Sequence, residues 1–331
     1  MRRQEILAVI FSDLHLENYK KFNEGKRRLK NAKDVIRKIA LVCKKYKAIS
    51  IFTGDLYHKE KGLTNDILED TLPFFSKLYS SGKFETFGIT GNHDQSQQNL
   101  IGKESPSYIK TLAKTFKGFH CFDFSQFEIP NTNVIVHGVP YLTHDIGLIK
   151  YINDIKVSPA YKNILALHTT MPGAKDTDGR EVHSNIENNE FNKAIQKFDL
   201  VICGHVHKPS MYKVGMTTVV QVGAPQQQRL TDKNCEMGYW LLYHDLKMEF
   251  VPFKGYPKFI EIENISQKTD NTNFYVLKPK RIERTSKEGL VKRDFGNTLD
   301  KEALAENYCK EKGISDKRKS KALSKTLKNV E

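Results

Sequence analysis

The stretch LVICGHVHKP, residues 200–209, joins a short apolar run to histidines at positions 205 and 207. A run of apolar residues followed by glycine is typical of a buried strand that ends in a turn. Side chains at positions i and i+2 of an extended chain point to the same face, so both imidazoles can face one site. The stretch therefore predicts a sheet whose strand ends carry ligands for metal ions.

Other apolar stretches end in the same kinds of residue. They supply Asp13 and His15 in SDLH, Asp55 in TGDLYH, Asn92 and His93 in TGNHD, and His168 in ALHTT. Glycines 54, 91 and 204 immediately precede three of these clusters, where glycine permits a sharp turn and a close approach of side chains to an ion. The pattern predicts two divalent cations about 3.5–4 Å apart, bridged by one carboxylate.

The type of metal follows from the ligand set. Imidazole, carboxylate and amide ligands together suit Mn²⁺, Fe²⁺ or Zn²⁺ better than Ca²⁺ or Mg²⁺. Each cluster on its own has an ordinary explanation as a polar turn or a core histidine. Their occurrence together at strand ends makes a dinuclear centre the better interpretation.

Strands alternate with amphipathic helices along most of the chain. We expect strands at 6–13, 48–55, 84–94 (ending in a loop), 133–141, 163–170, 200–207, 217–223, 237–245 and 248–253, and helices at 28–46 and 65–82. Pro73 is expected to kink or end the second helix. Buried strands separated by helices, followed by a run of strands, predict an α/β fold of two stacked mixed sheets with helices outside.

The charge of the chain points to a polyanionic partner. The 331 residues carry a net charge of +14, and the sequence pI is about 9.3. Such a balance favours nucleic acid or an anionic surface as partner, although a lysine-rich soluble protein would have the same composition. Residues 264–331 hold 17 basic and 10 acidic residues, so one fifth of the chain carries half of the excess charge.

Cysteine use and hydropathy bear on the compartment. The five cysteines are widely spaced and never form CxxC, which argues against a disulfide framework or a cysteine zinc site. The apolar run near the N-terminus is too short for a secretory signal, and no apolar stretch approaches 18 residues. We therefore expect a protein of the cytoplasm, or of the host cytoplasm if it is viral, without a membrane partner.

These motifs in this order resemble the calcineurin-like metallophosphoesterase superfamily, whose pattern is D-x-H, G-D, G-N-H-D/E, H and G-H-x-H. All five blocks occur between about residues 6 and 260. Within the superfamily the chain is most similar to the SbcD type, the nuclease subunit of double-strand-break repair complexes. That similarity lies in GDLYH (54–58), GVPY (138–141) and GAPQQQ (223–228), and the short chain is closest in size to compact phage versions.

The resemblance implies a fold and a division into domains. The expected fold is a four-layer α-β-β-α sandwich with a short basic helical tail. Residues 1–263 would form the nuclease domain and residues 264–297 a linker or reduced capping segment. Residues 298–331 would form the tail, with helices at 298–313 and 315–328, and would dock on an SbcC-type, SMC-like ATPase or bind DNA loosely.

The resemblance also assigns roles to single residues. One metal would be held by Asp13, His15, Asp55 and His207, and the other by Asp55, Asn92, His168 and His205, with Asp55 as the bridge; Mn²⁺ is the expected ion. His93 would protonate or stabilise the leaving oxygen, and His58 would assist there or position DNA. Asp94 would orient His93 or merely cap a turn. Arg180 and His183, in a loop between ligand blocks, are weaker candidates for contacts at the site.

The predicted function is a DNA exonuclease and endonuclease subunit that processes double-strand breaks in recombination and repair. The alternative is a small-substrate metallophosphodiesterase of the same superfamily. A protein phosphatase is disfavoured because GDLYHKE, residues 54–60, lacks the arginine that follows the aspartate in those enzymes. A non-enzymatic scaffold is disfavoured because every metal histidine is present. A homodimer through helices within 65–82 and 106–117 is implied by resemblance alone.

Overall fold

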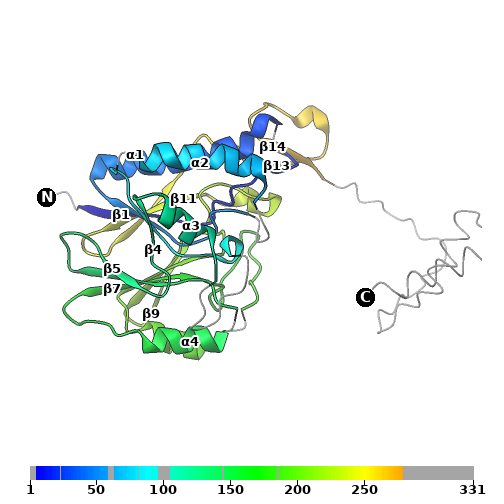
Figure 1. Ribbon diagram of the computed structural model, residues 1–331. Coiled ribbons are helices and arrows are strands. Elements are labelled where there is room, and N and C mark those ends of the chain that lie inside the picture. Colours follow the sequence, from blue (N-terminus) through cyan, green and yellow to red (C-terminus); the bar gives the residue numbers. More distant parts are fainter. Residues whose placement is uncertain are drawn as a thin grey trace, which may run out of the picture. The chain divides into compact units, whose positions relative to one another are not determined.

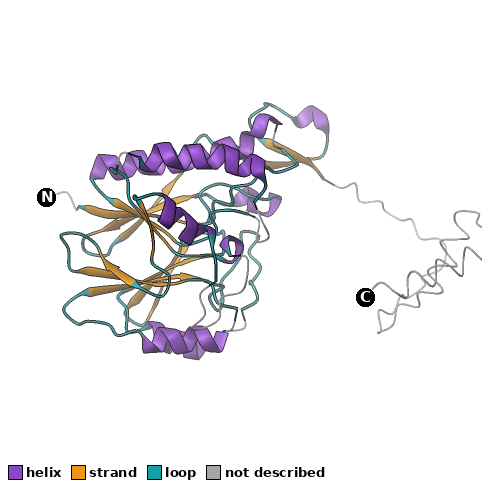
Figure 2. Ribbon diagram, viewed as in Figure 1, coloured by secondary structure: helices purple, strands orange, loops and turns teal. Residues whose placement is uncertain are grey.

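The computed structural model describes residues 5–22, 24–58, 63–80, 82–95, 105–143, 145–184 and 186–278 (Figure 1). Most of the predicted linker and both of the predicted tail helices lie outside these residues. Two sheets form the centre of the described part, and helices cover their outer faces (Figure 2). Within this part, no helix combines the length and apolar character needed to cross a membrane.

The first sheet is mixed and contains both parallel and antiparallel strands. Its strand order is β12 (Met248–Pro252), β11 (Gly238–Tyr243), β1 (Ile6–Phe11), β2 (Ile49–Phe52), β3 (Thr86–Gly88) and β4 (Phe119–Cys121). Strands β1 to β4 run parallel, and β11 runs antiparallel to both β1 and β12. The parallel arrangement brings the carboxyl ends of β1, β2 and β3 to one edge.

The second sheet has the same mixed character. Its strand order is β5 (Gln126–Glu128), β6 (Val134–Val139), β7 (Lys162–His168), β8 (Leu200–Gly204), β10 (Thr217–Gln221) and β9 (Ser210–Val214). The four central strands are parallel, and the two edge strands are antiparallel to their neighbours. The central strands are apolar on both faces because both faces are covered, as in parallel sheets generally.

Separate layers of apolar side chains hold the sheets and helices together. Ile10 and Ile51 of the first sheet pack against Ile164 and Ile202 of the second, and all four are fully buried. Helices α1 (Arg27–Tyr46), α2 (Asn65–Tyr79) and α3 (Tyr108–Thr115) cover the first sheet, and α4 (Asp145–Asp154) and α5 (Asn188–Ile195) cover the second. The predicted four-layer α-β-β-α sandwich is confirmed.

Two local features differ from the expectation. Helix α2 continues through Pro73 to Tyr79, so the predicted early break is wrong. Ile67, Phe75 and Tyr79 are buried on both sides of the proline, and this packing holds the helix together where one backbone hydrogen bond is missing. Most ligand-bearing strands also end before their ligands, so the ligands lie in loops.

A third, two-stranded sheet follows the sandwich. Strands β13 (Phe259–Ile262) and β14 (Phe274–Leu277) are parallel, and the ring of Phe22 packs against Phe259 and Phe274. The compact unit of the chain extends to Pro279. The predicted boundary between residues 263 and 264 therefore falls between two paired strands.

Short 3-10 helices complete the described part of the chain: η1 (Glu24–Lys26), η2 (Asn92–Asp94), η3 (Leu230–Asn234) and η4 (Ile265–Gln267). Of these, η2 begins immediately after Gly91 and carries the GNHD block. Helix η3 follows the GAPQQQ block. Asp94 of η2 accepts the N–H of Asp55, and Asp232 of η3 faces His207, so both short helices adjoin predicted ligands.

Candidate metal centre

The loops that follow the parallel strands meet where the two sheets face each other. The N–H of Asp13 donates to the Gly54 carbonyl at 3.0 Å, and the N–H of His15 donates to the Asp55 carbonyl at 3.1 Å. The N–H of His205, from the second sheet, donates to both carboxylate oxygens of Asp13 at 3.1 and 3.2 Å. The first and last ligand blocks are thus joined across the two sheets.

Several ligand residues adopt a backbone conformation that side chains disfavour. Asp13, His15, Asp55 and His205 have positive φ angles of 50°, 46°, 62° and 92°. A non-glycine residue in this region costs about 1–3 kcal/mol and persists only where the surrounding structure enforces it. Such strain concentrated in four ligand residues marks a functional site.

The glycines before the ligand blocks permit close contacts. A Cβ atom at Gly54, which has φ of +101°, would overlap with His168 Nδ1. A Cβ atom at Gly91 would overlap with the Asp55 carboxylate, and one at Gly204 would overlap with the Ser12 hydroxyl. Neighbouring protein groups thus approach the backbone closely at all three glycines, and a turn through positive φ occurs at Gly54.

Asp13, His15 and His207 form the first cluster of potential ligands. His15 Nε2 lies 3.2 Å from His207 Nε2 and 4.0 Å from Asp13 Oδ1. Burial lowers the pKa of His15 well below its ordinary value, so its imidazole is neutral. A neutral imidazole is the form that binds a metal.

Asp55, Asn92, His168 and His205 form the second cluster. Asn92 Oδ1 lies 3.0 Å from His168 Nε2 and 2.9 Å from His205 Nδ1. His168 Nδ1 lies 2.6 Å from the Thr53 carbonyl, which makes Nδ1 the donor and leaves Nε2 for a metal. Although burial opposes a charge there, Asp55 raises the pKa of His168 to about 9, and the same negative field would hold a cation at Nε2.

Asp55 lies between the two clusters. Its Oδ2 is 3.7 Å from His15 Nε2 and 3.3 Å from His168 Nε2. Ligand atoms bound at about 2.0–2.2 Å to one ion lie roughly 3.0–3.5 Å apart, which is close to these separations. Although burial opposes ionisation, His168 and its hydrogen bond hold the pKa of Asp55 well below its ordinary value. The residues therefore fit two divalent ions that share Asp55.

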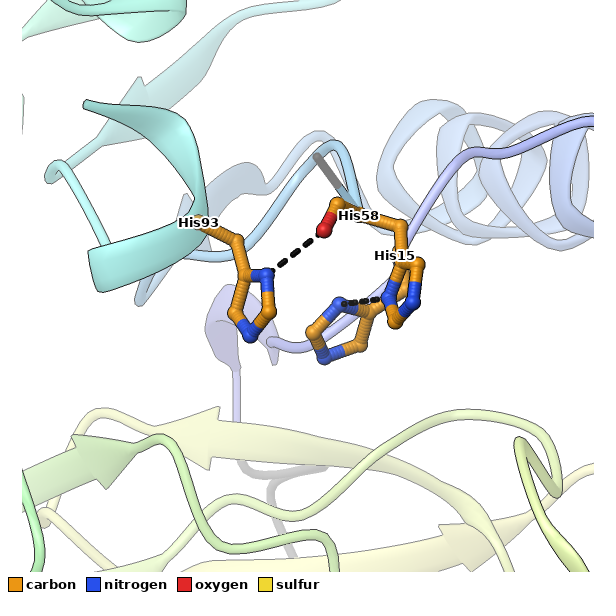
Figure 3. Close-up of side chains that lie close together, drawn as sticks. All are labelled: His15, His58 and His93. Carbon is orange, nitrogen blue, oxygen red and sulfur yellow. Dashed lines mark hydrogen bonds between the residues drawn. The ribbon is translucent and has the colours of Figure 1, made fainter. Parts of the chain in front are cut away.

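His93 and His58 lie beside His15 of the first cluster (Figure 3). Their rings stack at a centroid distance of 5.3 Å, and His93 Nδ1 lies 2.6 Å from the His58 carbonyl. His58 Nδ1 lies 3.3 Å from His15 Nδ1. Burial and the nearby His93 lower the pKa of His58 to about 4, so His58 is neutral. If Nδ1 of His93 donates to that carbonyl, its Nε2 stays available for a reacting group.

Asp94 caps a turn, which is the simpler of its two predicted roles. Its carboxylate accepts the N–H groups of Asp55 at 2.8 Å, Leu56 at 2.9 Å, Gly91 at 3.0 Å and Tyr57 at 3.3 Å. Burial and the neighbouring Asp55 raise the pKa of Asp94 to about 7. The four hydrogen bonds to its carboxylate hold the loop that carries Asp55. The backbone of His93 is instead held by Asp55, whose Oδ1 accepts the His93 N–H at 2.9 Å.

A cavity of about 330 Å³ opens next to the clusters. Besides His15, Asp55, His58, His93, His205 and His207, it is lined by Tyr19, Asp176, Val182, Val206, Gln228 and Arg229. Neither Arg180 nor His183 is among the lining residues, and Arg180 is instead 87% exposed and paired with Asp178. The arginine at the cavity is Arg229, which forms an ion pair with Asp176.

Sequence reasoning missed Tyr19 and Arg229, along with Arg28 and Asp232 behind the cavity wall. Tyr19 donates through its hydroxyl to the His15 carbonyl at 3.1 Å, and the Arg28 guanidinium stacks on its ring at 3.5 Å. Although burial opposes ionisation, His207 and Thr177 hold the pKa of Asp232 at about 2. The one signal available was GAPQQQ (223–228), which ends at Gln228 and immediately precedes Arg229.

Comparison with known proteins places the chain among phosphoesterases. The family model described as calcineurin-like phosphoesterase matches residues 7–209. No sequence among curated proteins matches the chain. In structure, the chain is similar to a dimetal phosphatase from Danio rerio, with 10% identity, a TM-score of 0.46, and coverage of 72% of this chain and 93% of that chain.

An archaeal phosphodiesterase is also similar. Its identity is 14% and its TM-score is 0.37, with coverage of 74% of this chain and 99% of that chain. At these scores neither structure carries an argument about substrate.

Proposed function

The chain belongs to the calcineurin-like phosphoesterase family and is a metal-dependent hydrolase of phosphoester bonds, and from this premise we propose that it is a DNA nuclease. Its substrate would be the phosphodiester backbone of DNA at broken ends, hairpins or single strands. The two ions would be Mn²⁺. The proposed role is the processing of double-strand breaks in recombination and repair.

The position of His58 carries the proposal. This residue ends the GDLYH block, which resembles the corresponding block of SbcD-type nucleases. Its ring lines the cavity, stacks on His93 at 5.3 Å and contacts His15. A histidine at the cavity wall can donate a hydrogen bond to an oxygen of a phosphodiester, and the net charge of +14 favours a polyanion as the substrate.

The chain's own residues define the chemistry. When bound, two divalent ions supply a water of lowered pKa and neutralise phosphate oxygens. Asp13, His15, Asp55, Asn92, His168, His205 and His207 would hold them. His93 Nδ1 is fixed at the His58 carbonyl, so a proton on Nε2 can pass to the leaving oxygen. This transfer accompanies formation of a bond from a water oxygen to phosphorus and breakage of the P–O bond to the leaving oxygen, and the proton that the water loses passes to solvent.

Partners follow from the same proposal. DNA would be steered to the cavity by the basic chain. An SbcC-type ATPase would bind residues 298–331, which lie outside the described residues. A second copy of the chain would pair through α2 and α3, and the protein would act in the cytoplasm.

A small-substrate metallophosphodiesterase is the second candidate. The observation that favours it is the cavity volume of about 330 Å³, within the roughly 300–1,000 Å³ of small-molecule sites. Arg229, which pairs with Asp176 at the wall, offers a cation beside a substrate phosphate. The two candidates differ in substrate and share the metal chemistry.

One experiment separates the two candidates. The purified chain is incubated with Mn²⁺ and labelled hairpin or linear duplex DNA, beside bis-p-nitrophenyl phosphate. His93→Ala tests the mechanism, and His244→Ala, at an exposed position, is the matched control. We expect degradation of DNA that requires Mn²⁺ and His93, is blocked by a chelator, and is retained in His244→Ala.

Cleavage of the small diester with DNA left intact would favour the second candidate. The same assay repeated with a cognate SbcC-type ATPase would then decide. If the partner restores DNA cleavage, the result supports the nuclease proposal. If DNA stays intact with the partner present, the nuclease proposal is rejected.

A further inference from the structure

Asp232 is a fully buried carboxylate outside the predicted ligand set. It lies on η3 and has no solvent exposure. Its Oδ1 accepts the Thr177 hydroxyl at 2.7 Å. Its Oδ2 accepts the N–H groups of Gln228 at 2.8 Å and Arg229 at 3.2 Å. A buried carboxylate held from two directions is a fixed negative charge.

The carboxylate faces one side of a metal ligand. His207 Nδ1 is buried and has no hydrogen-bond partner among the described residues, and it lies 3.8 Å from Asp232 Oδ2. The opposite nitrogen, His207 Nε2, lies 3.2 Å from His15 Nε2 in the first cluster. His207 therefore points one nitrogen at the metal site and the other at Asp232.

We propose that Asp232 is the positioning residue of the first metal site. With a cation on Nε2 of His207, the N–H at Nδ1 donates to Asp232 Oδ2. The gap of 3.8 Å closes to an ordinary hydrogen bond of about 2.8 Å through a shift of about 1 Å. Such an outer carboxylate selects the tautomer, orients the ring and makes the imidazole a stronger ligand.

At the second site a backbone carbonyl, rather than a carboxylate, orients the ligand histidine. His168 Nδ1 contacts the Thr53 carbonyl at 2.6 Å, so its orientation depends on the backbone. Loss of the Asp232 carboxylate should therefore weaken one site and spare the other. That asymmetry distinguishes positioning of His207 from a general loss of structure.

Thr177 extends the contact to the cavity wall. It lies in the loop between β7 and α5, next to Asp176, which pairs with Arg229 at the cavity. The same loop that lines the cavity thus holds Asp232 in place. Removing the Thr177 hydroxyl should loosen Asp232 and weaken the same metal site to a smaller extent.

The test is a Mn²⁺ titration of the full-length, metal-free chain by calorimetry. Asp232→Asn keeps the volume of the side chain and removes its charge, and Asp232→Glu keeps the charge. Thr177→Val removes only the hydroxyl. Asp270→Asn is the matched control, because Asp270 also accepts two backbone N–H groups and a hydroxyl, from Tyr275, within a turn.

We expect two sites in the wild type. Asp232→Asn should weaken one site about 10–100-fold and leave the other unchanged, with partial recovery in Asp232→Glu. Thr177→Val should weaken the same site less, and Asp270→Asn should bind as the wild type does. The thermal midpoint of each variant, measured in chelator, reports its metal-free stability.

Two results would overturn the inference. One is wild-type affinity at both sites in Asp232→Asn. The other is an equal weakening of both sites that follows a lower metal-free midpoint, which would make Asp232 a structural cap of η3. If Asp232→Asn does not fold, Thr177→Val decides by the same criteria. The inference rests on the metal centre of the proposed function. If the chain binds two ions but does not cut DNA, the nuclease proposal fails and the inference about Asp232 stands.

Discussion

Replacing Asp94 with asparagine separates its capping role from a role in orienting His93. The exchange keeps one oxygen and replaces the other with an amide NH₂. In the structure Oδ2 accepts the N–H groups of Asp55 and Gly91 at 2.8 and 3.0 Å, and Oδ1 accepts those of Leu56 and Tyr57. Asparagine can serve one pair, so the other pair loses its acceptor in a fully buried place.

The magnitude follows from these bonds. At about pH 8.5, above its pKa of about 7, Asp94 is a carboxylate. A hydrogen bond to a charged group contributes about 1.5–3 kcal/mol, so losing two at this pH destabilises the fold by about 3–6 kcal/mol. That is a large fraction of the total stability of about 5–15 kcal/mol of a native protein. The loop that carries Asp55 would open first, so metal binding would weaken as well.

The assay is urea unfolding of the metal-free protein, with His93→Ala as the comparison. His93 is only partly buried, and its replacement should change the free energy of unfolding by less than about 1 kcal/mol. A wild-type free energy of unfolding in Asp94→Asn, with activity lost as in His93→Ala, would refute the capping argument. That result would instead support a role for Asp94 in orienting His93.

Three further perturbations follow from the structure. Gly54→Ala should lose Mn²⁺ binding in calorimetry, because the added Cβ overlaps with His168 and the backbone has φ of +101°; binding that persists would contradict the close approach. Arg27→Ala removes hydrogen bonds to two carbonyls before β14 and the contact with the Phe274 ring, and should destabilise the fold by about 1–3 kcal/mol in urea, without changing Mn²⁺ affinity. Burial lowers the pKa of His137 below its ordinary 6.5, so below about pH 6.5 the unfolded chain binds a proton that the folded chain does not. His137 therefore lowers the free energy of unfolding as the pH falls from about 6.5 to its lowered pKa, by up to about 1.4 kcal/mol per pH unit, and has no such effect at higher pH. His137→Phe should reduce this loss between pH 7.5 and 5.5 in chelator, and an unchanged loss would exclude His137 as its source.

Local patterns were enough to predict the fold class and the ligand clusters. Buried strands such as 163–170 contain a short apolar run, here ILAL at 164–167, and the helix at 28–46 repeats its apolar residues at helical spacing. Both signals are contained within a few consecutive residues. Strands β3, β4 and β5 span three residues each, too few for a period to show, and the last two were not predicted.

The meeting of the ligand blocks at one site was also predictable, because each block directly follows a predicted strand. Parallel strands place their carboxyl ends at one edge, so residues that follow successive strands meet there. Positions i and i+2 then share a face, as in the pairs at 13 and 15 and at 205 and 207. In the structure His15 Nε2 lies 3.2 Å from His207 Nε2, and His205 Nδ1 lies 2.9 Å from Asn92 Oδ1.

The sequence by itself determined the two-sheet architecture and the set of residues that could bind metals. Only the tertiary structure decided which residues support them: Asp94 holds the loop of Asp55, and Asp232 faces His207. It also decided that Arg229 lines the cavity while Arg180 does not. The physical reason is that strand and helix periods are properties of neighbouring residues, whereas the partner of a buried polar group is whichever group packing brings within hydrogen-bond distance.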